Sequence, residues 1–316
     1  MSTVNTMRAI SQDTLGGPEV LKEIEVERPA PRPNQVLVRV RAAGLNPTDW
    51  KHRANGGFLG EPPFVLGWDV SGVVEAVGIG VATFKPGDEV FGMLPYPFGH
   101  GSHAEYVLAP VRALTHKPAS IDHVQAAALP LVSLTAWQAL VENAELRPGQ
   151  RVLIHAAAGG VGHVAVQIAK ARGAYVIGTA SAGKHAFLRE LGADEVIDYR
   201  ETDFTEAVKD VDVVLDTLGG DTSVDSLRVL RPGGIVVSIL PVGSDEFHEE
   251  AERLGVRALR MLVDASHSGM TAIAELVEAG KLRPTIAGTF PLADAAEAHA
   301  LGDTGRTTGK LVLVTD

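Results

Sequence analysis

The amino-acid sequence predicts an α/β protein in which a doubly wound parallel sheet is inserted into a β-rich domain. Three observations support this fold class. The first third of the chain consists of short β-rich runs, the middle alternates apolar runs with amphipathic helices, and residues 282–316 return to the style of the first third. A length of 316 residues also exceeds the usual size of a single hydrophobic core, so we expect more than one domain.

The first third contains strands that alternate in polarity. Val36, Val38 and Val40 recur at every second position of residues 35–41, which is typical of a half-buried strand. Turn signals such as the Lys-Pro-Gly-Asp run at 85–88 separate the later strands. We expect these at Val70–Val77, Glu89–Met93 and Ala104–Leu108.

After about residue 125 the pattern changes to that of βαβ units. Six apolar runs predict the strands of a Rossmann sheet, at Arg151–Ala156, Tyr175–Thr179, Glu195–Ile197, Val211–Asp216, Gly234–Leu240 and Arg257–Val263. Helical periodicity between and after them predicts helices at Val161–Arg172, Lys184–Leu191, Ser223–Leu230 and Met270–Ala279.

The C-terminal segment predicts a short helix, Ala293–Leu301, and an apolar strand, Lys310–Thr315. A terminal strand needs a sheet to join, and the economical placement is on the N-terminal domain. We therefore expect residues 1–127 and 268–316 to form the β-rich domain and residues 128–267 to form the inserted Rossmann domain.

The composition restricts the possible functions. An apolar fraction of 45% and a charged fraction of 21% are typical of a soluble globular protein. The net charge of −11 argues against a nucleic-acid partner, because an acidic surface repels a phosphate backbone. The absence of cysteine excludes disulfides, thiolate metal sites and thiol redox chemistry, so any redox chemistry requires a cofactor.

The chain also lacks the apolar segments that direct proteins to membranes. Residues 1–10 have no apolar core resembling a signal peptide, and no apolar run elsewhere is long enough to span a bilayer. We therefore expect a cytoplasmic protein with no membrane partner.

A glycine loop lies between the first Rossmann strand and its helix. Gly159 and Gly162 occupy the second and third positions of a dinucleotide fingerprint, and Ala157 occupies the first. Glycines at these positions let the backbone approach a pyrophosphate, which the helix N-terminus then binds. This context favours a dinucleotide site over a purely structural turn.

The end of the second Rossmann strand indicates which dinucleotide binds. An acidic residue at this point would bind the 2′-hydroxyl of NAD, but the chain has Gly-Thr-Ala-Ser at residues 178–181. Ser181 could donate a hydrogen bond and Lys184 a charge to the 2′-phosphate of NADPH. The alternative is a helix N-cap serine followed by a solvated lysine.

These residues, together with the runs at 42–49 (AAGLNPTD), 85–90 (KPGDEV) and 308–313 (TGKLVL), resemble the medium-chain dehydrogenase/reductase superfamily over essentially the whole chain. Asn-Pro-Thr-Asp at 46–49 and the glycine loop are most similar to the zinc-independent quinone oxidoreductase, or zeta-crystallin-like, branch. Residues 179–184 also resemble enoyl-reductase domains of polyketide synthases. The resemblance implies a GroES-like substrate domain, an NADPH-binding Rossmann domain and a nicotinamide in the cleft between them.

The resemblance also implies the residues that contact the cofactor. Their places are the nicotinamide ribose, the diphosphate, the pyrophosphate loop, the 2′-phosphate and the ends of strands that face the dinucleotide. Asn46 is expected at the nicotinamide ribose, Thr135 at the diphosphate, and Ala158, Gly159, Gly160 and Val161 in the pyrophosphate loop. Thr179 holds the ribose-reading position, and the 2′-phosphate residues are Ser181, Lys184 and Tyr199. The residues at the strand ends are Leu218 and Leu240. For Tyr199 and the two leucines the alternative is simple packing.

The sequence predicts no metal site. Zinc-dependent members of the superfamily bind the ion through a cysteine and a histidine at the positions of Asn46 and Trp68, and neither an amide nor an indole replaces these ligands. His100 and His103 lie in a glycine-rich loop, where we expect them to face solvent or bond to the backbone rather than bind metal.

Without a metal ion, conjugate reduction is the favoured chemistry. Nothing would stabilise the alkoxide needed to oxidise a simple alcohol, whereas a quinone or an α,β-unsaturated ketone delocalises the incoming charge itself. The candidate catalytic donors are Asn46 and Thr48. Related enzymes often carry a tyrosine a few residues later, where this chain has Trp50, Lys51 and His52, so the proton donor stays open.

Further expectations concern the substrate and partners. Aromatic residues at 58, 68, 96 and 98 could line an apolar pocket, although domain packing is the commoner role of such residues. Two other functions stay open: an enoyl-thioester reductase, which would need a basic groove for its carrier arm, and a non-catalytic NADPH-binding protein. The last Rossmann strand is apolar enough to pair with a second copy, so we expect a homodimer.

Overall fold

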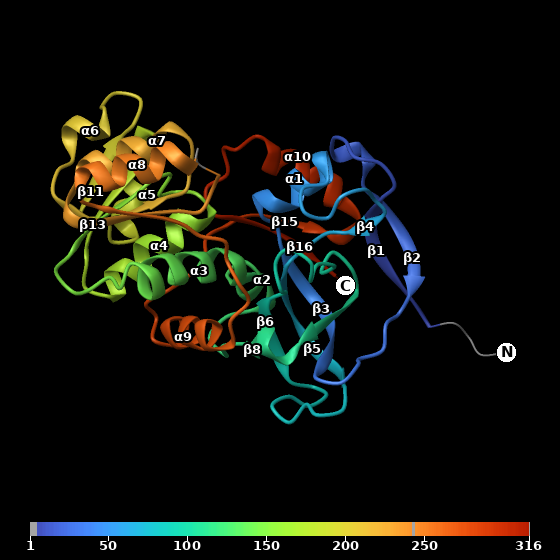
Figure 1. Cartoon of the computed structure of the whole chain (residues 1–316). Helices are drawn as coiled ribbons and strands as arrows, with labels where there is room; N and C mark the ends of the chain where they lie inside the picture. Colours follow the sequence, from blue (N-terminus) through green and yellow to red (C-terminus); the bar gives the residue numbers. More distant parts are fainter. Residues whose placement is uncertain (1–4, 242–243, 316) are drawn as a thin grey trace. The chain divides into compact units, whose positions relative to one another are not determined.

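The computed structural model describes residues 5–241 and 244–315, which divide into two compact units. The first unit extends to Leu134 and resumes at Asp264, and the second comprises Thr135–Val263 (Figure 1). The second unit is thus an insertion into the first, as the fold class predicted. The units change at 134/135 and 263/264, after the expected 127/128 boundary and before the expected 267/268 boundary.

The first unit contains a seven-stranded sheet and a three-stranded sheet. The large sheet has the order β15-β16-β3-β5-β6-β8, with β7 also paired to β3, and the small one has the order β2-β1-β4. The strands are β1 (Thr6–Gln12), β2 (Lys22–Glu27), β3 (Gln35–Gly44), β4 (Phe64–Val65), β5 (Asp69–Val77), β6 (Glu89–Met93), β7 (Tyr106–Pro110), β8 (Leu114–His116), β15 (Ile286–Pro291) and β16 (Lys310–Val314).

The alternation expected in β3 holds from Val38 to Arg41 but not at Leu37, which is also buried. Val36, Val38 and Val40 are buried, whereas Arg39 and Arg41 are half-buried. This strand is central because it pairs antiparallel with β5, β7 and β16. Asn46, two residues beyond its C-terminal end, therefore follows a strand that is paired on both sides.

The terminal strand returns to the N-terminal part of the chain, as predicted. Val312 of β16 pairs with Gly44 of β3, and β15 pairs parallel with β16. This pairing brings Lys310, at the start of β16, to the segment that follows β3. The helices of this unit are α1 (Pro47–Asn55), α2 (His123–Ala127), α9 (His267–Glu278) and α10 (Ala295–Asp303), and α3 (Pro130–Trp137) spans the unit boundary.

The second unit is a Rossmann sheet of parallel strands in the order β11-β10-β9-β12-β13-β14. Counted along this unit, the order is 3-2-1-4-5-6, which places the topological switch point between β9 and β12. Ligands bind in such sheets outside the carboxyl ends of the strands at this point. The strands are β9 (Arg151–Ile154), β10 (Tyr175–Ala180), β11 (Glu195–Asp198), β12 (Val211–Asp216), β13 (Leu230–Ser238) and β14 (Arg257–Arg260).

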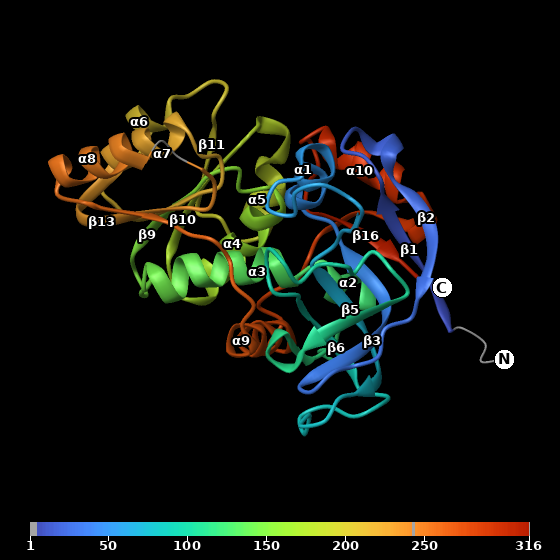
Figure 2. The same ribbon diagram turned by 45° about the vertical axis from the view of Figure 1, so that its right-hand side comes forward.

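Helices cover both faces of this sheet. Figures 1 and 2 show α4 on one face and α7 and α8 on the other. On the face covered by α8, the core contains Leu153, Ile177, Val214 and Val236 of the strands, with Phe247 of α8 packed against them. The helices are α4 (Gly160–Ala171), α5 (His185–Glu190), α6 (Phe204–Ala207), α7 (Asp221–Ser226) and α8 (Ser244–Leu254), and a π-helix follows α3 at Gln138–Asn143.

All the predicted elements occur, but several ends differ. The strand expected from Gly234 begins at Leu230, and the helix expected from Met270 begins at His267, because the Ser266 hydroxyl caps it by accepting a hydrogen bond from Gly269 N at 3.0 Å. The helix expected at 223–230 is a short α-helix followed by a 3-10 turn. Within the described residues, no helix combines the length and apolarity required to cross a bilayer.

Candidate active site

The glycine loop joins β9 to α4 at the switch point of the Rossmann sheet. Gly159 is the N-cap of α4. Gly162, in the first turn of the helix, packs closely against the backbone of Ala156 and Ala157. A Cβ at Gly162 would lie 2.4 Å from Ala156 O and 2.6 Å from Ala157 Cα. Only glycine fits at this position, which is the helix–strand packing role of the third fingerprint glycine.

The predicted pyrophosphate residues surround the N-terminus of α4. Ala158 is buried, whereas Gly159, Gly160 and Val161 are half-buried. The first N–H groups of an α-helix have no partner within the helix and carry a partial positive charge. The loop can therefore bind a pyrophosphate through backbone donors at this edge of the sheet.

The side chain of Thr179, near the end of β10, is hydrogen-bonded to the backbone of this loop. Its side chain is almost fully buried, and its hydroxyl accepts a hydrogen bond from Ala156 N at 3.2 Å. The same oxygen lies 3.3 Å from His155 Nδ1. Thr179 thus holds the conformation of the glycine loop, and direct contact between its hydroxyl and a cofactor stays a prediction.

The predicted 2′-phosphate residues lie at the carboxyl ends of two adjacent strands. Ala180 pairs with Asp198 in register, so Ser181 and Tyr199 are each the first residue beyond the pairing. Ser181 and Lys184 are half-buried, and the Tyr199 side chain is 58% exposed. The register therefore brings these predicted residues to one edge of the sheet.

Sequence reasoning did not identify two charged residues at this edge. The Arg200 guanidinium lies over the Tyr199 ring, 5.7 Å from its centroid, and adds a positive charge beside the predicted phosphate residues. The Asp198 carboxylate accepts hydrogen bonds from Ala182 N at 2.9 Å and from Arg200 N at 3.0 Å. Asp198 thus ties the two loops together. Its position at the end of a predicted β-strand is the sequence feature that could have identified it.

Leu218 and Leu240 follow another adjacent pair of strands. Asp216 of β12 pairs with Ser238 of β13, and each leucine lies two residues beyond that pair. Leu218 is 51% exposed and Leu240 is half-buried. The Asp216 carboxylate holds this loop by accepting hydrogen bonds from the Leu218 N–H at 2.9 Å and the Ser238 hydroxyl at 2.7 Å. Thr135, predicted near the diphosphate, is buried at the start of the second unit.

In the first unit, Asn46 is the N-cap of α1 and is completely buried. Its backbone N–H donates to Asp49 Oδ2 at 2.7 Å, and its side-chain amide donates to Asp69 Oδ2 at 2.9 Å. Its amide oxygen accepts a hydrogen bond from Lys310 Nζ. The amide is thus engaged on both its oxygen and its nitrogen, and contact with a nicotinamide ribose stays a prediction.

Asp69 and Lys310 form a buried ion pair beside Asn46. Lys310 Nζ lies 3.4 Å from Asp69 Oδ2 and donates to Leu45 O at 2.6 Å, while Asp69 Oδ1 accepts from Leu131 N at 2.7 Å. Burial raises the pKa of Asp69 and lowers that of Lys310, and the attraction between the two charges opposes both shifts. Lys310 was missed as a candidate site residue, although it lies in the terminal Gly-Lys run that carried the resemblance.

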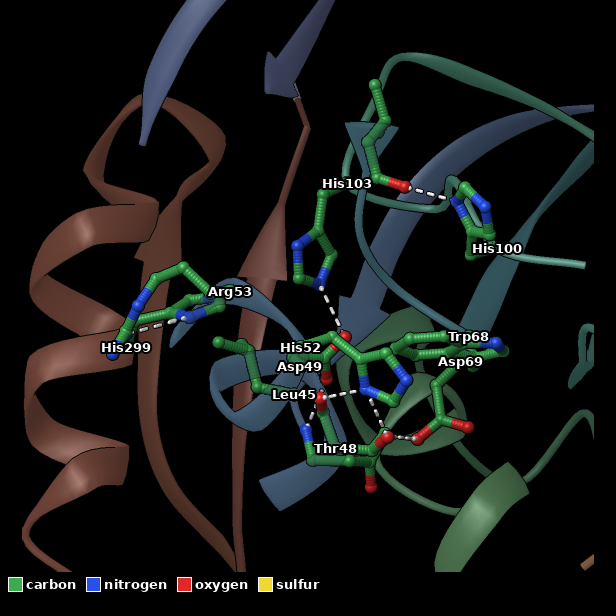
Figure 3. A network of polar contacts seen from close by, with 12 residues as sticks. Leu45, Thr48, Asp49, His52, Arg53, Trp68, Asp69, His100, His103 and His299 are labelled. Atoms are coloured by element: carbon green, nitrogen blue, oxygen red, sulfur yellow. Dashed lines mark hydrogen bonds and ion pairs between the residues drawn. The ribbon is translucent and has the colours of Figure 1, made fainter. Parts of the chain in front are cut away.

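Asp49 and His103 face each other in the interior, as Figure 3 shows. Asp49 Oδ1 lies 3.9 Å from His103 Nε2, and both side chains are completely buried. Burial raises the pKa of Asp49 to about 7 and lowers the pKa of His103 to about 3. Burial therefore favours the protonated carboxyl of Asp49 and the neutral imidazole of His103.

The expectation for His103 was wrong. The residue neither faces solvent nor bonds the backbone through its ring, and neither ring nitrogen has a hydrogen-bond partner in the described part of the chain. The main chain explains this burial, because His103 N donates to Leu66 O at 3.0 Å and His103 O accepts from Ile10 N at 2.9 Å. His100 is bonded to the backbone as expected, with Nδ1 2.6 Å from Val65 O.

Thr48, the second predicted catalytic residue, is half-buried on the first turn of α1. Its hydroxyl lies 3.0 Å from Tyr96 Oη and 3.0 Å from His52 Nδ1. The sequence indicated Tyr96 only as part of an apolar wall. The structure instead brings its phenol to a predicted donor, and the two residues are 48 positions apart in the sequence.

The other aromatic residues are divided between interior and surface. Trp68 is completely buried and lies against Tyr96, with ring centroids 5.3 Å apart, whereas Phe58 and Phe98 are 55% and 73% exposed. The Trp68 indole donates to Pro97 O at 3.0 Å. Trp68 therefore supports the Tyr96 loop from within the core.

The residues at the zinc-ligand positions do not fit a zinc ion. The Asn46 amide is already bonded to Asp69 and Lys310, and an ammonium group occupies the neighbourhood of its oxygen. The Trp68 nitrogen is a donor with no lone pair for a metal. Across residues 5–241 and 244–315, no group of three or more His, Cys, Asp or Glu side chains is arranged to hold a metal.

Two family models match the chain. The alcohol dehydrogenase GroES-like domain matches residues 32–119, and the zinc-binding dehydrogenase model matches residues 191–313. Among curated relatives, the mouse protein "NAD(P)H oxidoreductase RTN4IP1, mitochondrial" is 37% identical over 324 residues, covering 89% of this chain and 82% of its own. Human quinone oxidoreductase is 34% identical over 326 residues, covering 98% of each.

Solved structures agree with these relatives. The quinone oxidoreductase of Coxiella burnetii has 40% identity and a TM-score of 0.93, covering 99% of this chain and 100% of its own. An NAD-dependent alcohol dehydrogenase has 36% identity and a TM-score of 0.89, with coverage of 98% and 100%. The CurK enoyl reductase has 30% identity and a TM-score of 0.88, with coverage of 98% and 99%. The chain therefore belongs to the zinc-independent quinone oxidoreductase branch of the medium-chain dehydrogenase/reductase superfamily, a family of nicotinamide-dependent oxidoreductases.

Proposed function

We propose that the protein uses NADPH to reduce quinones or α,β-unsaturated carbonyl compounds without zinc. The observation that carries this proposal is the closed network of Asn46, Asp69 and Lys310 at the position where zinc-dependent relatives bind their ion. The amide nitrogen and oxygen of Asn46 are both bonded within this network, and the cation in it is the Lys310 ammonium group. The half-buried Thr48 hydroxyl, 3.0 Å from the Tyr96 phenol, remains as a neutral group on the helix that follows Asn46.

Neutral donors suit an acceptor that delocalises charge. NADPH supplies a hydride to the substrate, and with one proton from water a quinone becomes a hydroquinone, or an enone becomes a saturated ketone. The side chains of the protein need only orient the acceptor and hydrogen-bond the oxygen that gains charge. A localised alkoxide would require the stronger stabilisation of a metal ion.

The sheet edge beyond β10 and β11 supports the choice of NADPH over NADH. Ser181, Lys184 and Arg200 supply a hydroxyl and two cations there, and cations favour a 2′-phosphate over a 2′-hydroxyl. The Asp198 carboxylate accepts hydrogen bonds from the backbone on both sides of this edge, so it braces the loops instead of reading the ribose.

Titration of the two cofactors tests this choice. Dissociation constants from fluorescence titration should be lower for NADPH than for NADH, and Lys184→Ala should weaken NADPH while leaving NADH unchanged. Lys209→Ala, which removes an exposed lysine of the same unit, should change neither constant. Equal or tighter binding of NADH by the unmodified protein would contradict the proposal.

Metal independence is tested by chelation. Activity should survive prolonged treatment with a chelator, because the Asn46 amide and the Trp68 indole offer no ligand to zinc. Stoichiometric zinc by elemental analysis, together with activity that is lost on chelation and restored by metal, would overturn this part of the proposal.

The similarity to the CurK enoyl reductase, 30% identical with a TM-score of 0.88, favours one second candidate. An enoyl-thioester reductase would also transfer hydride to a conjugated carbon. A steady-state screen of NADPH consumption against quinones, simple enones and enoyl thioesters separates the two activities. Fastest turnover of the thioester would support the second candidate, and no turnover of any acceptor would indicate a non-catalytic NADPH-binding protein.

A further inference from the structure

The hydroxyl groups of Thr48 and Tyr96 belong to a longer chain of hydrogen bonds. Thr48 Oγ1 lies 3.0 Å from Tyr96 Oη and 3.0 Å from His52 Nδ1. On the other side of the imidazole, His52 Nε2 lies 3.1 Å from the backbone nitrogen of Phe58. The direction in which the protons of this chain point depends on which nitrogen of His52 carries hydrogen.

The backbone of Phe58 determines that tautomer. Its N–H can only donate, so His52 Nε2 must accept and carries no hydrogen. Nδ1 therefore carries the hydrogen, which it donates to Thr48 O at 2.7 Å and shares with Thr48 Oγ1. Burial lowers the pKa of His52, which favours this neutral form.

The orientation of the next two hydroxyls follows from this tautomer. Because His52 Nδ1 is a donor, the Thr48 hydroxyl cannot donate to it, and its acceptor in the chain is Tyr96 Oη. The phenolic O–H of Tyr96 is then directed away from Thr48. Donors aligned in one direction strengthen one another, so the last O–H of the chain is the most polarised.

We propose that Tyr96 is a catalytic residue that donates this last hydrogen bond to the substrate oxygen on which negative charge develops during reduction. The inference rests on the proposed function and adds a named donor to it. The hydride forms a bond to the substrate carbon, the displaced π-electron pair moves to the oxygen held by Tyr96, and a proton from water gives the enol. The enol of an enone tautomerises to the saturated ketone, and that of a quinone tautomerises to the hydroquinone. Thr48 is then a positioning residue that acts through Tyr96.

The surroundings of Tyr96 suit this role. The phenol is half-buried, and its ring contacts those of Trp68 and Phe58, with centroid distances of 5.3 Å and 6.0 Å. Burial also raises the pKa of Tyr96, so the phenol keeps its proton at neutral pH. A phenol is a far stronger acid than the Thr48 hydroxyl, and it is therefore the better donor to a charged oxygen.

The test compares Tyr96→Phe with Thr48→Val in steady-state reduction of 2-cyclohexenone and a naphthoquinone by NADPH. Tyr96→Phe keeps the ring and its packing but removes the donor. We expect kcat to fall by about 10- to 100-fold with little change in KM, because the hydrogen bond strengthens only as charge develops. Thr48→Val should lower kcat less, since it leaves the phenol in place.

The control is Tyr106→Phe, which removes a half-buried phenol from β7 and leaves the ring under the Arg28 guanidinium. It should match the unmodified enzyme in rate, and all three variants should keep its thermal unfolding midpoint. An unchanged kcat in Tyr96→Phe, or a larger loss in Thr48→Val than in Tyr96→Phe, would overturn the assignment of Tyr96. Failure of the unmodified enzyme to oxidise NADPH with any conjugated acceptor would refute the proposed function itself, and the inference with it.

Discussion

The two units of this chain form their polar sites in different ways. In the Rossmann unit, the candidate pyrophosphate site consists of backbone groups, namely the glycine loop at 158–161 and the first N–H groups of α4. In the other unit, the polar network consists of buried side chains from distant segments, such as Asn46, Asp69 and Lys310. A backbone site depends on whether a Cβ fits, whereas a side-chain network depends on whether every charge has a partner.

This difference determines how each site should respond to mutation. Replacing a glycine in the loop adds atoms where space is absent, and the cost is steric. Removing one member of the buried network leaves another charge uncompensated in the interior, and the cost is electrostatic. We therefore expect the larger loss of stability in the unit that carries the network.

Lys310→Met should have the largest effect. It removes the cation from Asp69 and Asn46, both of which are completely buried, and should lower the free energy of unfolding by about 3–5 kcal/mol. Chemical denaturation measures this change. The double variant Lys310→Met/Asp69→Asn should recover most of the loss, because it also removes the unpaired carboxylate.

The matched control is Lys22→Met, which breaks an exposed ion pair with Asp13. It should leave stability unchanged within error, since exposed pairs contribute little. If Lys310→Met were as mild as this control, or if the added Asp69→Asn change lowered stability further, Asp69 and Lys310 would not form the charge pair described.

Gly162→Ala should have an intermediate effect. Its new Cβ would lie 2.4 Å from Ala156 O, so the loop must shift, at a cost of about 1–3 kcal/mol. The shift should also weaken NADPH binding at least tenfold in a fluorescence titration, because the loop donors lose their positions. Gly183→Ala is the control, as its Cβ would meet no heavy atom within 4 Å, and it should keep the stability of the unmodified protein.

Within one pH unit below neutrality, Asp49→Asn should have the smallest effect, visible in the pH dependence of stability. Burial raises the pKa of Asp49 from 3.8 to about 7, so the folded state binds a proton more tightly than the unfolded state. Stability should therefore fall as pH rises from about 4 to about 7. From pH 6 to pH 7 this contribution is about 1 kcal/mol.

Urea denaturation of both proteins at several pH values measures the Asp49 contribution as a difference. The more distant titrating groups are present in both proteins and cancel, whereas Asp69 and Lys310 interact with Asp49 and contribute to the difference. The unmodified protein should lose stability relative to Asp49→Asn over this pH range and run parallel to it above about pH 8. A difference that is constant with pH would show that Asp49 is already ionised throughout.

The same contrast explains what could be predicted from the sequence. The Rossmann strands and the glycine loop depend on local signals, because apolar runs and glycine spacing are read over a few residues. The hydrogen bond between Lys310 and Asn46 joins residues 264 positions apart, and that between Thr48 and Tyr96 joins residues 48 apart. No local pattern reports such contacts, which is why Tyr96, Lys310 and the burial of His103 became evident only in the structure.

Hydride transfer from NADPH to a conjugated carbon is the central claim, and isotopic labelling tests it most directly. The enzyme would reduce 2-cyclohexenone with NADPH deuterated at the transferring position, and mass spectrometry and NMR would locate the label in the product. A site with neutral donors and no zinc ligands at Asn46 and Trp68 predicts deuterium on the β-carbon of the saturated ketone. Deuterium on the carbonyl carbon, or faster turnover of simple alcohols with NADP⁺, would contradict it.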